Sequence, residues 1–320
     1  MFSAKYVLGR DVAGRMVEVL PDAVFLVSFP KSGNTWTRFL IGNLIHPEEP
    51  VTFANVDQIV PDIYGTAQND IRKVRPPRVF KSHEPFEPRY RRIIYIVRDP
   101  RDVAVSSYHF ARKGRHINDS LPLETYISAQ FLNRGHTFGS WGEHVGSWLV
   151  NPLNITQLVH LSYGSGRAFA SIDLGRRHCL GPREHAREFL LLRYEDLVEK
   201  TEQELSKVAE FLGLHASSGA LARAVELSAA DKMKKLERMQ SDLWGTTKEG
   251  RKDINFVREA KSGQWKKSVP AASVAEIESK WGYLMDLLGY ERGMTLLSNA
   301  ELNPSPKTKS ATPVRGGETT

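Results

Sequence analysis

A short polar loop between an apolar run and a helix-like stretch carries side chains that suit an anion. The stretch SFPKSGNTWTRFL spans Ser28–Leu40, and its loop offers the ammonium of Lys31 and the hydroxyls of Ser32 and Thr35. Gly33 lets the backbone approach a bound group closely, because it has no Cβ. Backbone N–H groups and the helix dipole favour negative charge at such a strand–loop–helix junction. The loop therefore predicts a phosphate-binding site.

The loop does not match the pattern of nucleoside-triphosphate-binding P-loops. In that pattern, G-x-x-x-x-G-K-[ST], the lysine follows a glycine, whereas here Lys31 precedes Gly33. No acidic residue closes a predicted strand at an obvious magnesium-binding position. A magnesium-dependent kinase is therefore the weaker alternative, and a plain turn without a ligand is another.

Arg98 is a second candidate for anion binding, at the end of an apolar run in YIVRDPRDVAVSSYHF (Tyr95–Phe110). A guanidinium at a strand end can bind two phosphate oxygens at once. Ser106 lies eight residues further on and could add a hydroxyl. The alternative for Arg98 is an ion pair with Asp99 or Asp102.

His83, in the stretch FKSHEPF, is the candidate general base. An unperturbed imidazole titrates near pH ~6.5 and can take a proton from a hydroxyl at neutral pH. It stands out among the ten histidines because it ends an apolar run beside Lys81. His109, His116 and His144 are predicted to be helix or loop residues without a catalytic role.

Apolar patterns predict the elements that hold these residues. Four short apolar runs predict strands over Ala23–Phe29, Pro77–His83, Arg92–Arg98 and Glu188–Tyr194. Helical spacing predicts helices over Thr35–Ile45, Asp102–Lys113 and Thr201–Leu214. This alternation indicates a single-domain α/β fold, a P-loop-like parallel sheet flanked by helices on both faces. Ligands bind beyond the carboxyl ends of such strands, where the candidate residues stand.

The composition is that of a globular protein with excess positive charge. Of 320 residues, 41% are hydrophobic and 25% charged, and the formal net charge of +7 favours an anionic partner. Cys179 is the single cysteine, which excludes an intramolecular disulfide and a zinc site built from several cysteines. We expect no membrane span, because no apolar run is long enough. The charged first twenty residues do not suit a signal peptide, so a cytoplasmic location is expected.

One domain is predicted over residues 1–300. The stretch Asn151–Arg187 is long, rich in Gly and Arg, and has one plausible strand at Ile155–Leu161. We interpret this stretch, near residues 151–187, as an insertion or a surface excursion. Residues 301–320 contain very few apolar residues and are predicted to form a disordered tail.

Three motifs together resemble the cytosolic sulfotransferase family. FPKSGNTW is similar to the family's 5′-phosphosulfate loop, P-K-S-G-T-T-W, from which Asn34 departs. YIVRDPRDVAVSSYHF looks like its 3′-phosphate-binding segment, with Arg98 and Ser106 as the matching residues. FVREAKSGQWKK is similar to the C-terminal segment R-K-G-x-x-G-D-W-K, with Arg258 as the matching arginine. The resemblance covers most of Val24–Lys267.

The resemblance implies an enzyme that uses 3′-phosphoadenosine 5′-phosphosulfate (PAPS) and releases 3′-phosphoadenosine 5′-phosphate (PAP). Such enzymes move a sulfuryl group onto an acceptor hydroxyl or amine by in-line displacement, and no metal is expected. The resemblance assigns His83 as the general base, Lys31 to the bridging oxygen of the leaving phosphate, and Lys81 to the sulfuryl group. Positioning and charge neutralisation carry most of such a reaction.

The resemblance also assigns the residues that bind the donor. Those for the phosphates are Lys31, Ser32, Gly33, Asn34, Thr35, Arg98, Ser106 and Arg258, with the backbone of Glu259 and Ala260; those for the adenine are Trp36, Tyr194 and Ser228. Ala230 stands where the family has an aromatic residue beside the purine. Glu259 brings a negative charge to the phosphate, and Ala260 replaces a glycine. We therefore expect weaker nucleotide binding than is typical of the family.

The acceptor pocket is expected near His83, lined by Tyr64, Phe86 and Phe138. A small-molecule acceptor is expected, and phenols, steroids, aliphatic alcohols, sugars and lipids all remain open. A PAP-binding protein without chemistry is an alternative that the intact His83, Lys81 and Lys31 disfavour. A nucleic-acid partner is not expected, because the sequence has no basic helix face interleaved with aromatic residues. The family's dimer motif is not clearly present in KKSVPAASVAEIE, so the oligomeric state stays open.

Overall fold

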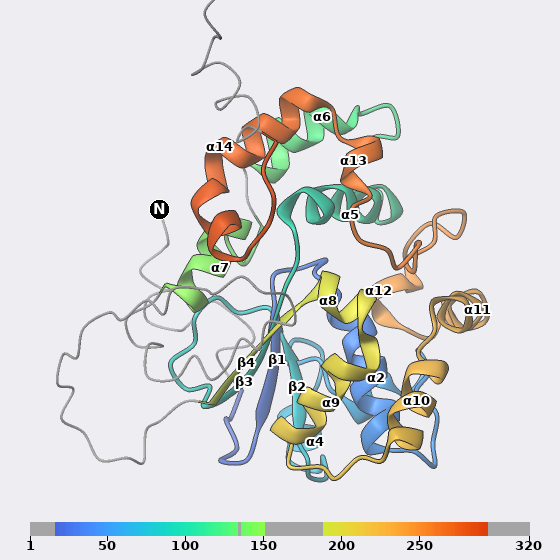
Figure 1. Cartoon of the computed structure of the whole chain (residues 1–320). Helices are drawn as coiled ribbons and strands as arrows, with labels where there is room; N and C mark the ends of the chain where they lie inside the picture. The colour runs from blue at the N-terminus through green and yellow to red at the C-terminus, as the bar shows by residue number, and fades with distance from the viewer. Residues whose placement is uncertain (1–16, 134–135, 151–187, 294–320) are drawn as a thin grey trace, which may run out of the picture.

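A four-stranded parallel sheet lies at the centre of the protein (Figure 1). The computed structural model describes residues 17–133, 136–150 and 188–293. The strand order is β2-β1-β3-β4, with every neighbouring pair parallel. The strands are β1 (Val24–Ser28), β2 (Val79–Ser82), β3 (Arg92–Val97) and β4 (Glu188–Arg193). All four predicted strands are thus confirmed, with ends that differ by at most two residues.

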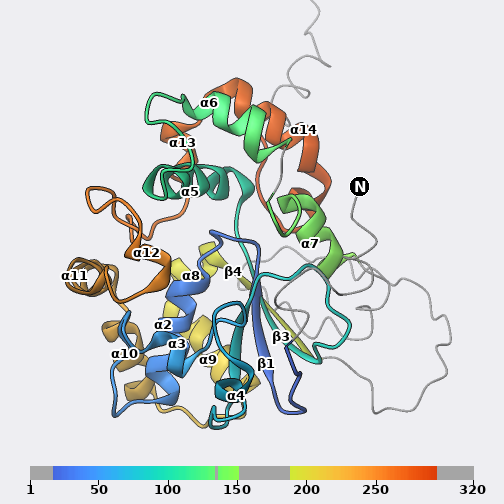
Figure 2. The same cartoon turned by 180° about the vertical axis from the view of Figure 1, so that it is seen from behind.

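Helices cover both faces of this sheet, as the two opposite views show (Figures 1 and 2). Along β1 the side chains alternate: Phe25 and Val27 pack into one apolar core, and Val24 and Leu26 into the other. The first core is closed by α5 (Pro100–Lys113), α6 (Leu123–Tyr126), the π-helical η2 (Ile127–Phe131), α7 (Trp141–Leu149) and α14 (Ala271–Leu287). Because β1 is buried on both sides, it reads as a continuous apolar run.

The second core lies under helices from both halves of the chain. It is closed by α2 (Asn34–Ile45), α3 (Val56–Ile59), α8 (Tyr194–Glu199), α9 (Thr201–Phe211), α10 (Ser218–Leu227) and α11 (Ala230–Gln240). The remaining short helices are α4 (Gln68–Ile71), α12 (Gly245–Lys248) and α13 (Trp265–Ser268). The predicted single-domain α/β fold is confirmed, as are the three predicted helices, here α2, α5 and α9.

Three predictions concern residues that the structure does not describe. The proposed insertion at 151–187, its strand at Ile155–Leu161, and the tail at 301–320 lie outside the described residues. None of the helices in the described ranges combines the length and hydropathy that a bilayer crossing requires.

Candidate active site

The loop after β1 turns sharply into α2. Gly33 caps the helix with a φ of 103°, in the left-handed region that favours glycine. The ring of Tyr194, at the start of α8, covers this glycine, and a Cβ at position 33 would lie 2.4 Å from its Cδ2 atom. Lys31 also has a positive φ, of 70°. The loop therefore has two residues in the left-handed region, and Tyr194 packs on one of them.

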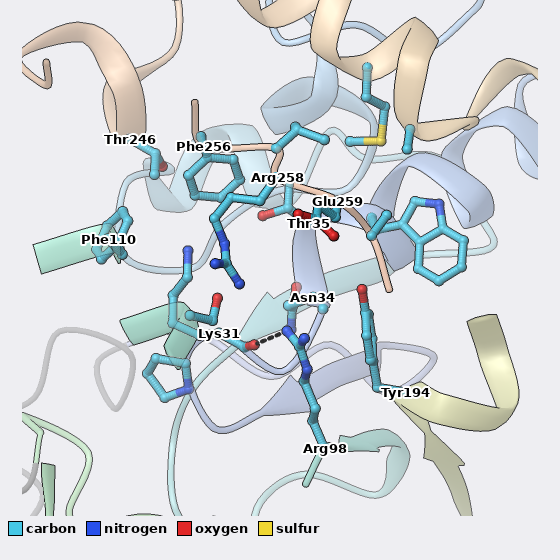
Figure 3. A pocket seen from close by; sticks show the side chains of 18 of the residues that line it. Lys31, Asn34, Thr35, Arg98, Phe110, Tyr194, Thr246, Phe256, Arg258 and Glu259 are labelled. Carbon is cyan, nitrogen blue, oxygen red and sulfur yellow. Dashed lines mark hydrogen bonds between the residues drawn. The ribbon is translucent and has the colours of Figure 1, made fainter. Parts of the chain in front are cut away.

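A cavity of about 320 Å³ opens beside this loop. It lies beyond the carboxyl ends of the strands, as predicted for an open parallel sheet. Its walls include the predicted residues Lys31, Gly33, Asn34, Thr35, Trp36, Lys81, His83, Arg98, Ser106, Tyr194, Arg258, Glu259 and Ala260. The structure thus brings most of the predicted site together in one place (Figure 3).

Two arginines reach the cavity from opposite sides (Figure 3). Arg98, which follows β3, donates from Nη1 to the carbonyl oxygen of Lys31 (3.2 Å) and from Nη2 to that of Lys261 (3.4 Å). Its guanidinium carbon lies 4.2 Å from the centre of the Tyr194 ring. Arg258 donates from Nη2 to Oε1 of Gln264 (3.1 Å). Burial, and then the charge of Arg98, lower the pKa of Arg258, which indicates two cations close together.

Lys31 lies between two aromatic rings. Its Nζ atom is 4.1 Å from the centre of the Phe110 ring and 4.2 Å from that of Phe256. Burial, and then the charges of Arg258 and Arg98, lower its pKa to about 7. The Glu237 carboxylate acts in the opposite direction but does not outweigh them, so a phosphate or sulfate group would stabilise the ammonium.

Some buried polar atoms in and beside the loop make no hydrogen bond, and they indicate which kind of ligand would suit the cavity. Among the described residues, Ser32 Oγ, Asn34 Oδ1 and Arg98 Nε are buried and make no hydrogen bond. A buried polar group without a partner is costly, and two of these three can donate to an anion. Arg98 also pairs with Asp102, as the sequence allowed, at 3.8 Å between Nη2 and Oδ2. The donors without partners, the excess of cations and the close backbone at Gly33 fit a phosphate-bearing ligand.

Asn34 uses its amide within the protein. Nδ2 donates to the carbonyl oxygen of Leu26 (3.1 Å) and to the hydroxyl of Ser28 (3.2 Å), both on β1. These bonds tie the start of α2 to β1, and the side chain is buried. The Asn34 amide is thus engaged within the protein, although the residue was predicted to bind phosphate.

His83 follows β2 and is held as one defined tautomer. Its Nδ1 lies 2.7 Å from the carbonyl oxygen of Ser28, and a carbonyl can only accept, so Nδ1 carries the proton. Nε2 is then the unprotonated nitrogen, which a general base needs. Burial and the charge of Lys81 hold the pKa of His83 well below its usual value, so the imidazole is neutral at neutral pH.

Lys81, on β2, is paired in a way that the sequence did not predict. Its Nζ forms an ion pair with Asp62. Burial lowers its pKa, and the Asp62 carboxylate acts in the opposite direction. Lys81 lines the same cavity as His83 and Lys31.

The segment that carries Arg258 forms one wall of the cavity and is anchored by two carboxylates. Glu237 of α11 accepts the backbone N–H groups of Phe256 (2.6 Å) and Val257 (2.8 Å). Asp102 of α5 accepts those of Gly263 (2.7 Å) and Trp265 (2.9 Å). The wall is thus held at both ends by helices that pack on opposite faces of the sheet.

Two departures from the family motif can be located within this wall. Ala260 has a φ of 51°, a left-handed conformation that suits the glycine of the motif better than an alanine. Glu259 lines the cavity, and its Oε2 accepts a weak hydrogen bond from Gln264 (3.4 Å). A carboxylate thus stands among the cations of the site.

The predicted adenine residues divide into two groups. Trp36 and Tyr194 line the cavity, with ring centres 5.9 Å apart. Ala230 also lines it. The Ser228 side chain is fully buried at the end of α10, where its hydroxyl accepts from Asn43 (3.0 Å). The structure therefore does not bring the Ser228 hydroxyl to the cavity, although its carbonyl oxygen fixes the indole N–H of Trp36 (3.0 Å).

Of the predicted acceptor residues, two lie beside His83. The His83 ring centre is 6.4 Å from that of Tyr64 and 5.7 Å from that of Phe138. The Tyr64 hydroxyl also accepts the backbone N–H of His83 (2.9 Å). Phe86 packs edge-on against Trp148, 5.4 Å between centres. None of the three predicted acceptor residues lines the cavity itself.

Several cavity residues were not predicted from the sequence. Phe110 and Phe256 lie within two of the quoted motifs, and their pairing around Lys31 was not foreseen. Met233 and Trp244 line the cavity near Ala230 and carry no local signal, because only the packing of α11 and α12 brings them there.

Known proteins resemble this chain in sequence. A family model described as a sulfotransferase domain matches residues 21–164 and 176–289. The 3-beta-hydroxysteroid sulfotransferase of Cavia porcellus is 26% identical over 281 residues, which cover 84% of this chain and 85% of that protein. Sulfotransferase 1A1 of Bos taurus is 26% identical over 307 residues, which cover 88% and 92%.

Solved structures share the fold. Mouse sulfotransferase SULT7A1 complexed with PAP aligns with a TM-score of 0.58 at 19% identity, over 90% of this chain and 91% of that chain. A retinol dehydratase in a complex with retinol and PAP aligns with a TM-score of 0.57 at 20% identity, over 83% and 81%.

Proposed function

The chain belongs to the sulfotransferase family and is a sulfotransferase, and from this premise we propose that it moves the sulfuryl group of PAPS onto a small-molecule acceptor. The acceptor group is a hydroxyl or an amine. The observation that carries the proposal is the meeting of Lys31, His83 and the two arginines Arg98 and Arg258 in one cavity. We further propose a cytoplasmic location, and a catalytic domain that spans residues 1–300.

The donor supplies an activated sulfuryl group joined to a phosphate leaving group. The loop N–H groups and Lys31 would hold the 5′-phosphosulfate end, and Arg98, Ser106 and Arg258 the 3′-phosphate. Trp36 and Tyr194 offer aromatic surfaces to the adenine. The cavity thus offers basic groups for both anionic ends of one nucleotide.

His83 is proposed as the general base. Its Nε2 takes the proton of the acceptor hydroxyl as the acceptor oxygen forms its bond to sulfur. The bond from sulfur to the bridging oxygen of the phosphate breaks in the same displacement, and PAP leaves. Ser28 keeps Nδ1 protonated throughout, which fixes the ring in the orientation that exposes Nε2.

Lys31 and Lys81 are proposed to offset the charge that develops during the displacement. A cation near the bridging oxygen stabilises the leaving phosphate, and preorganised groups of this kind are worth roughly 10²–10³ in rate. The bound anion would raise the pKa of Lys31 above its value of about 7 in the free protein, so that it carries a full charge during the reaction.

An acceptor screen with labelled PAPS tests the proposal. The screen should pair phenols, steroids, aliphatic alcohols and amines with the wild-type protein and with His83→Ala. We expect transfer to at least one acceptor, and a loss of about 10²–10⁴-fold in kcat in the variant. PAP affinity, measured by calorimetry without added metal, should change little in His83→Ala. Full-rate transfer by the variant would remove His83 from its role, and failure to bind PAP would contradict the proposed donor.

A further inference from the structure

The segment after α3 lies along β2 like a short additional strand. The N–H of Lys81 donates to the carbonyl oxygen of Pro61 (2.8 Å), and the N–H of Ile63 donates to the carbonyl oxygen of Lys81 (3.3 Å). Asp62 therefore stands opposite Lys81 in a parallel bridge. These bonds fix the backbone on both sides of Asp62 and thereby restrict the positions that its carboxylate can occupy.

Both oxygens of that carboxylate have partners. Oδ2 accepts from Nζ of Lys81, and Oδ1 accepts from the N–H of Tyr64 (3.2 Å). The side chains of Lys81 and Asp62 are only 13% and 22% exposed. A partly buried ion pair with a fixed backbone is stronger than a surface pair, because less solvent screens it.

The pair stands at the catalytic end of the cavity. Lys81 lines the cavity together with His83 and Lys31, and its charge lowers the pKa of both of these groups. Its Nζ is also 5.9 Å from the centre of the Tyr64 ring. A change in the charge of Lys81 would therefore change the pKa of His83, the proposed base, and of Lys31, the proposed leaving-group cation.

Several charged groups compete to set the protonation of Lys81. Burial lowers its pKa most, Asp62 opposes this, Arg38 of α2 lowers it, and Asp57 of α3 raises it slightly. Arg38 and Asp57 are themselves paired at 2.5 Å, so their charges largely offset one another. Asp62 is the remaining anion that is in direct contact with the lysine.

We propose that Asp62 is a positioning residue for sulfuryl transfer, which keeps Lys81 charged and holds its ammonium beside His83. This inference rests on the proposed function, because it concerns the same reaction. An uncharged Lys81 could not stabilise negative charge on the transferred group, and an unpaired one would be free to adopt other side-chain rotamers.

Competitive acetylation of lysines tests the pairing without any need for activity. The protein is labelled with acetic anhydride over a range of pH, and the modification of Lys81 is followed by mass spectrometry. In Asp62→Asn the midpoint for Lys81 should fall by about one to three pH units, the size expected for loss of an adjacent opposite charge. Asp62→Glu should restore most of the shift.

Asp57→Asn is the matched control, because it removes a carboxylate that acts on Lys81 without touching it. A midpoint in Asp62→Asn that equals the wild-type value, or moves no more than in Asp57→Asn, would overturn the proposal. Thermal unfolding of each variant checks that it is folded.

The pH profile of the reaction gives a second readout. In Asp62→Asn, kcat should begin to fall at a lower pH than in the wild type, while the affinity for PAP changes less. A loss of kcat that is equal at every pH would indicate a purely structural role and would overturn the proposal. If the wild-type protein transfers no sulfuryl group, the proposed function fails, and the acetylation result still decides whether Asp62 controls the charge of Lys81.

Discussion

The ring of Tyr194 lies directly against the α-carbon of Gly33. A Cβ at that position would be 2.4 Å from Cδ2 and 2.7 Å from Cε2 of the ring. The φ of 103° is unfavourable for a residue with a side chain as well. Both the turn of the loop and the packing of the Tyr194 ring therefore depend on the absence of a side chain at Gly33.

Gly33→Ala should impair both folding and ligand binding. We expect the free energy of unfolding to fall by about 1–3 kcal/mol, the usual cost of overpacking, and PAP to bind more than about tenfold more weakly, since 1.4 kcal/mol corresponds to a factor of ten. Denaturant titration and calorimetry measure the two effects. Gly213→Ala is the control, because Gly213 also has a positive φ, of 74°, with nothing within 4 Å. Equal losses of PAP affinity in the two variants would contradict the role of the Tyr194 contact.

Binding of PAP should be coupled to protonation of Lys31. The pKa of Lys31 is about 7 in the free protein, and a bound anion raises it, so between these two pKa values binding takes up a proton. Affinity should then weaken as pH rises above 7, by at most about tenfold per pH unit for one proton. Calorimetry at pH 8 in two buffers with different ionisation enthalpies measures the uptake.

Lys31→Arg is the control for this coupling, because a guanidinium stays charged over the whole range. The variant should still bind PAP but lose the proton uptake that belongs to position 31. Identical uptake in the wild type and in Lys31→Arg would assign the proton to another group.

His83 should remain neutral in the free protein at pH values where an ordinary histidine takes up a proton. Burial, together with the positive charge of Lys81, lowers its pKa well below 6.5, so protonation needs a more acidic solution. Nitrogen and proton NMR, with His83→Gln to assign the signal, should show the Nδ1–H tautomer. A titration midpoint at or above 6.5 in the free protein would count against this environment.

Glu259→Gln should tighten the binding of PAP. The carboxylate lines a cavity that is otherwise cationic, so its removal relieves repulsion of the ligand's phosphates. A gain of about three- to tenfold corresponds to roughly 1 kcal/mol, a modest value for charges in a partly solvated site. Glu202→Gln, which removes an exposed carboxylate on α9, should leave the dissociation constant unchanged. A weaker complex in Glu259→Gln would show that the carboxylate assists binding through Gln264.

Ala230→Phe should supply the aromatic surface that the family usually places beside the purine. Ala230 lines the cavity, and an added stacking contact of about 0.5–1.5 kcal/mol would tighten PAP binding by about two- to tenfold. Ala229→Phe adds the same ring at the exposed neighbouring position and should have no such effect. No gain in affinity for Ala230→Phe would mean that Met233 already fills this space.

Much of the fold could be predicted because its signals are local. The strands are short apolar runs, and β1 shows this plainly, since all five of its residues are buried. The start of α2 was placed within one residue because Gly33 marks the turn. The family was predicted correctly from three motifs, of which the first two follow β1 and β3, and the third follows α12 and runs into α13.

The parts of the site that were not predicted depend on contacts distant in sequence. The Ser228 hydroxyl meets Asn43, which is 185 residues away, and no local pattern could place it inside the core. Asp62 contacts Lys81 because the segment after α3 pairs with the edge of β2. Phe86 is close to His83 in sequence, and its ring packs against Trp148, which is 62 residues away.

The two hydrogen bonds that Asp102 accepts from the wall of the cavity have a mechanical consequence. Since Gly263 and Trp265 are both tied to one carboxylate, that end of the wall is tied to α5 and cannot move away from it by small independent steps. Outward displacement of this end of the wall would require either both bonds to open together or α5 to move with the wall. Asp102 thereby couples the position of the wall to that of α5.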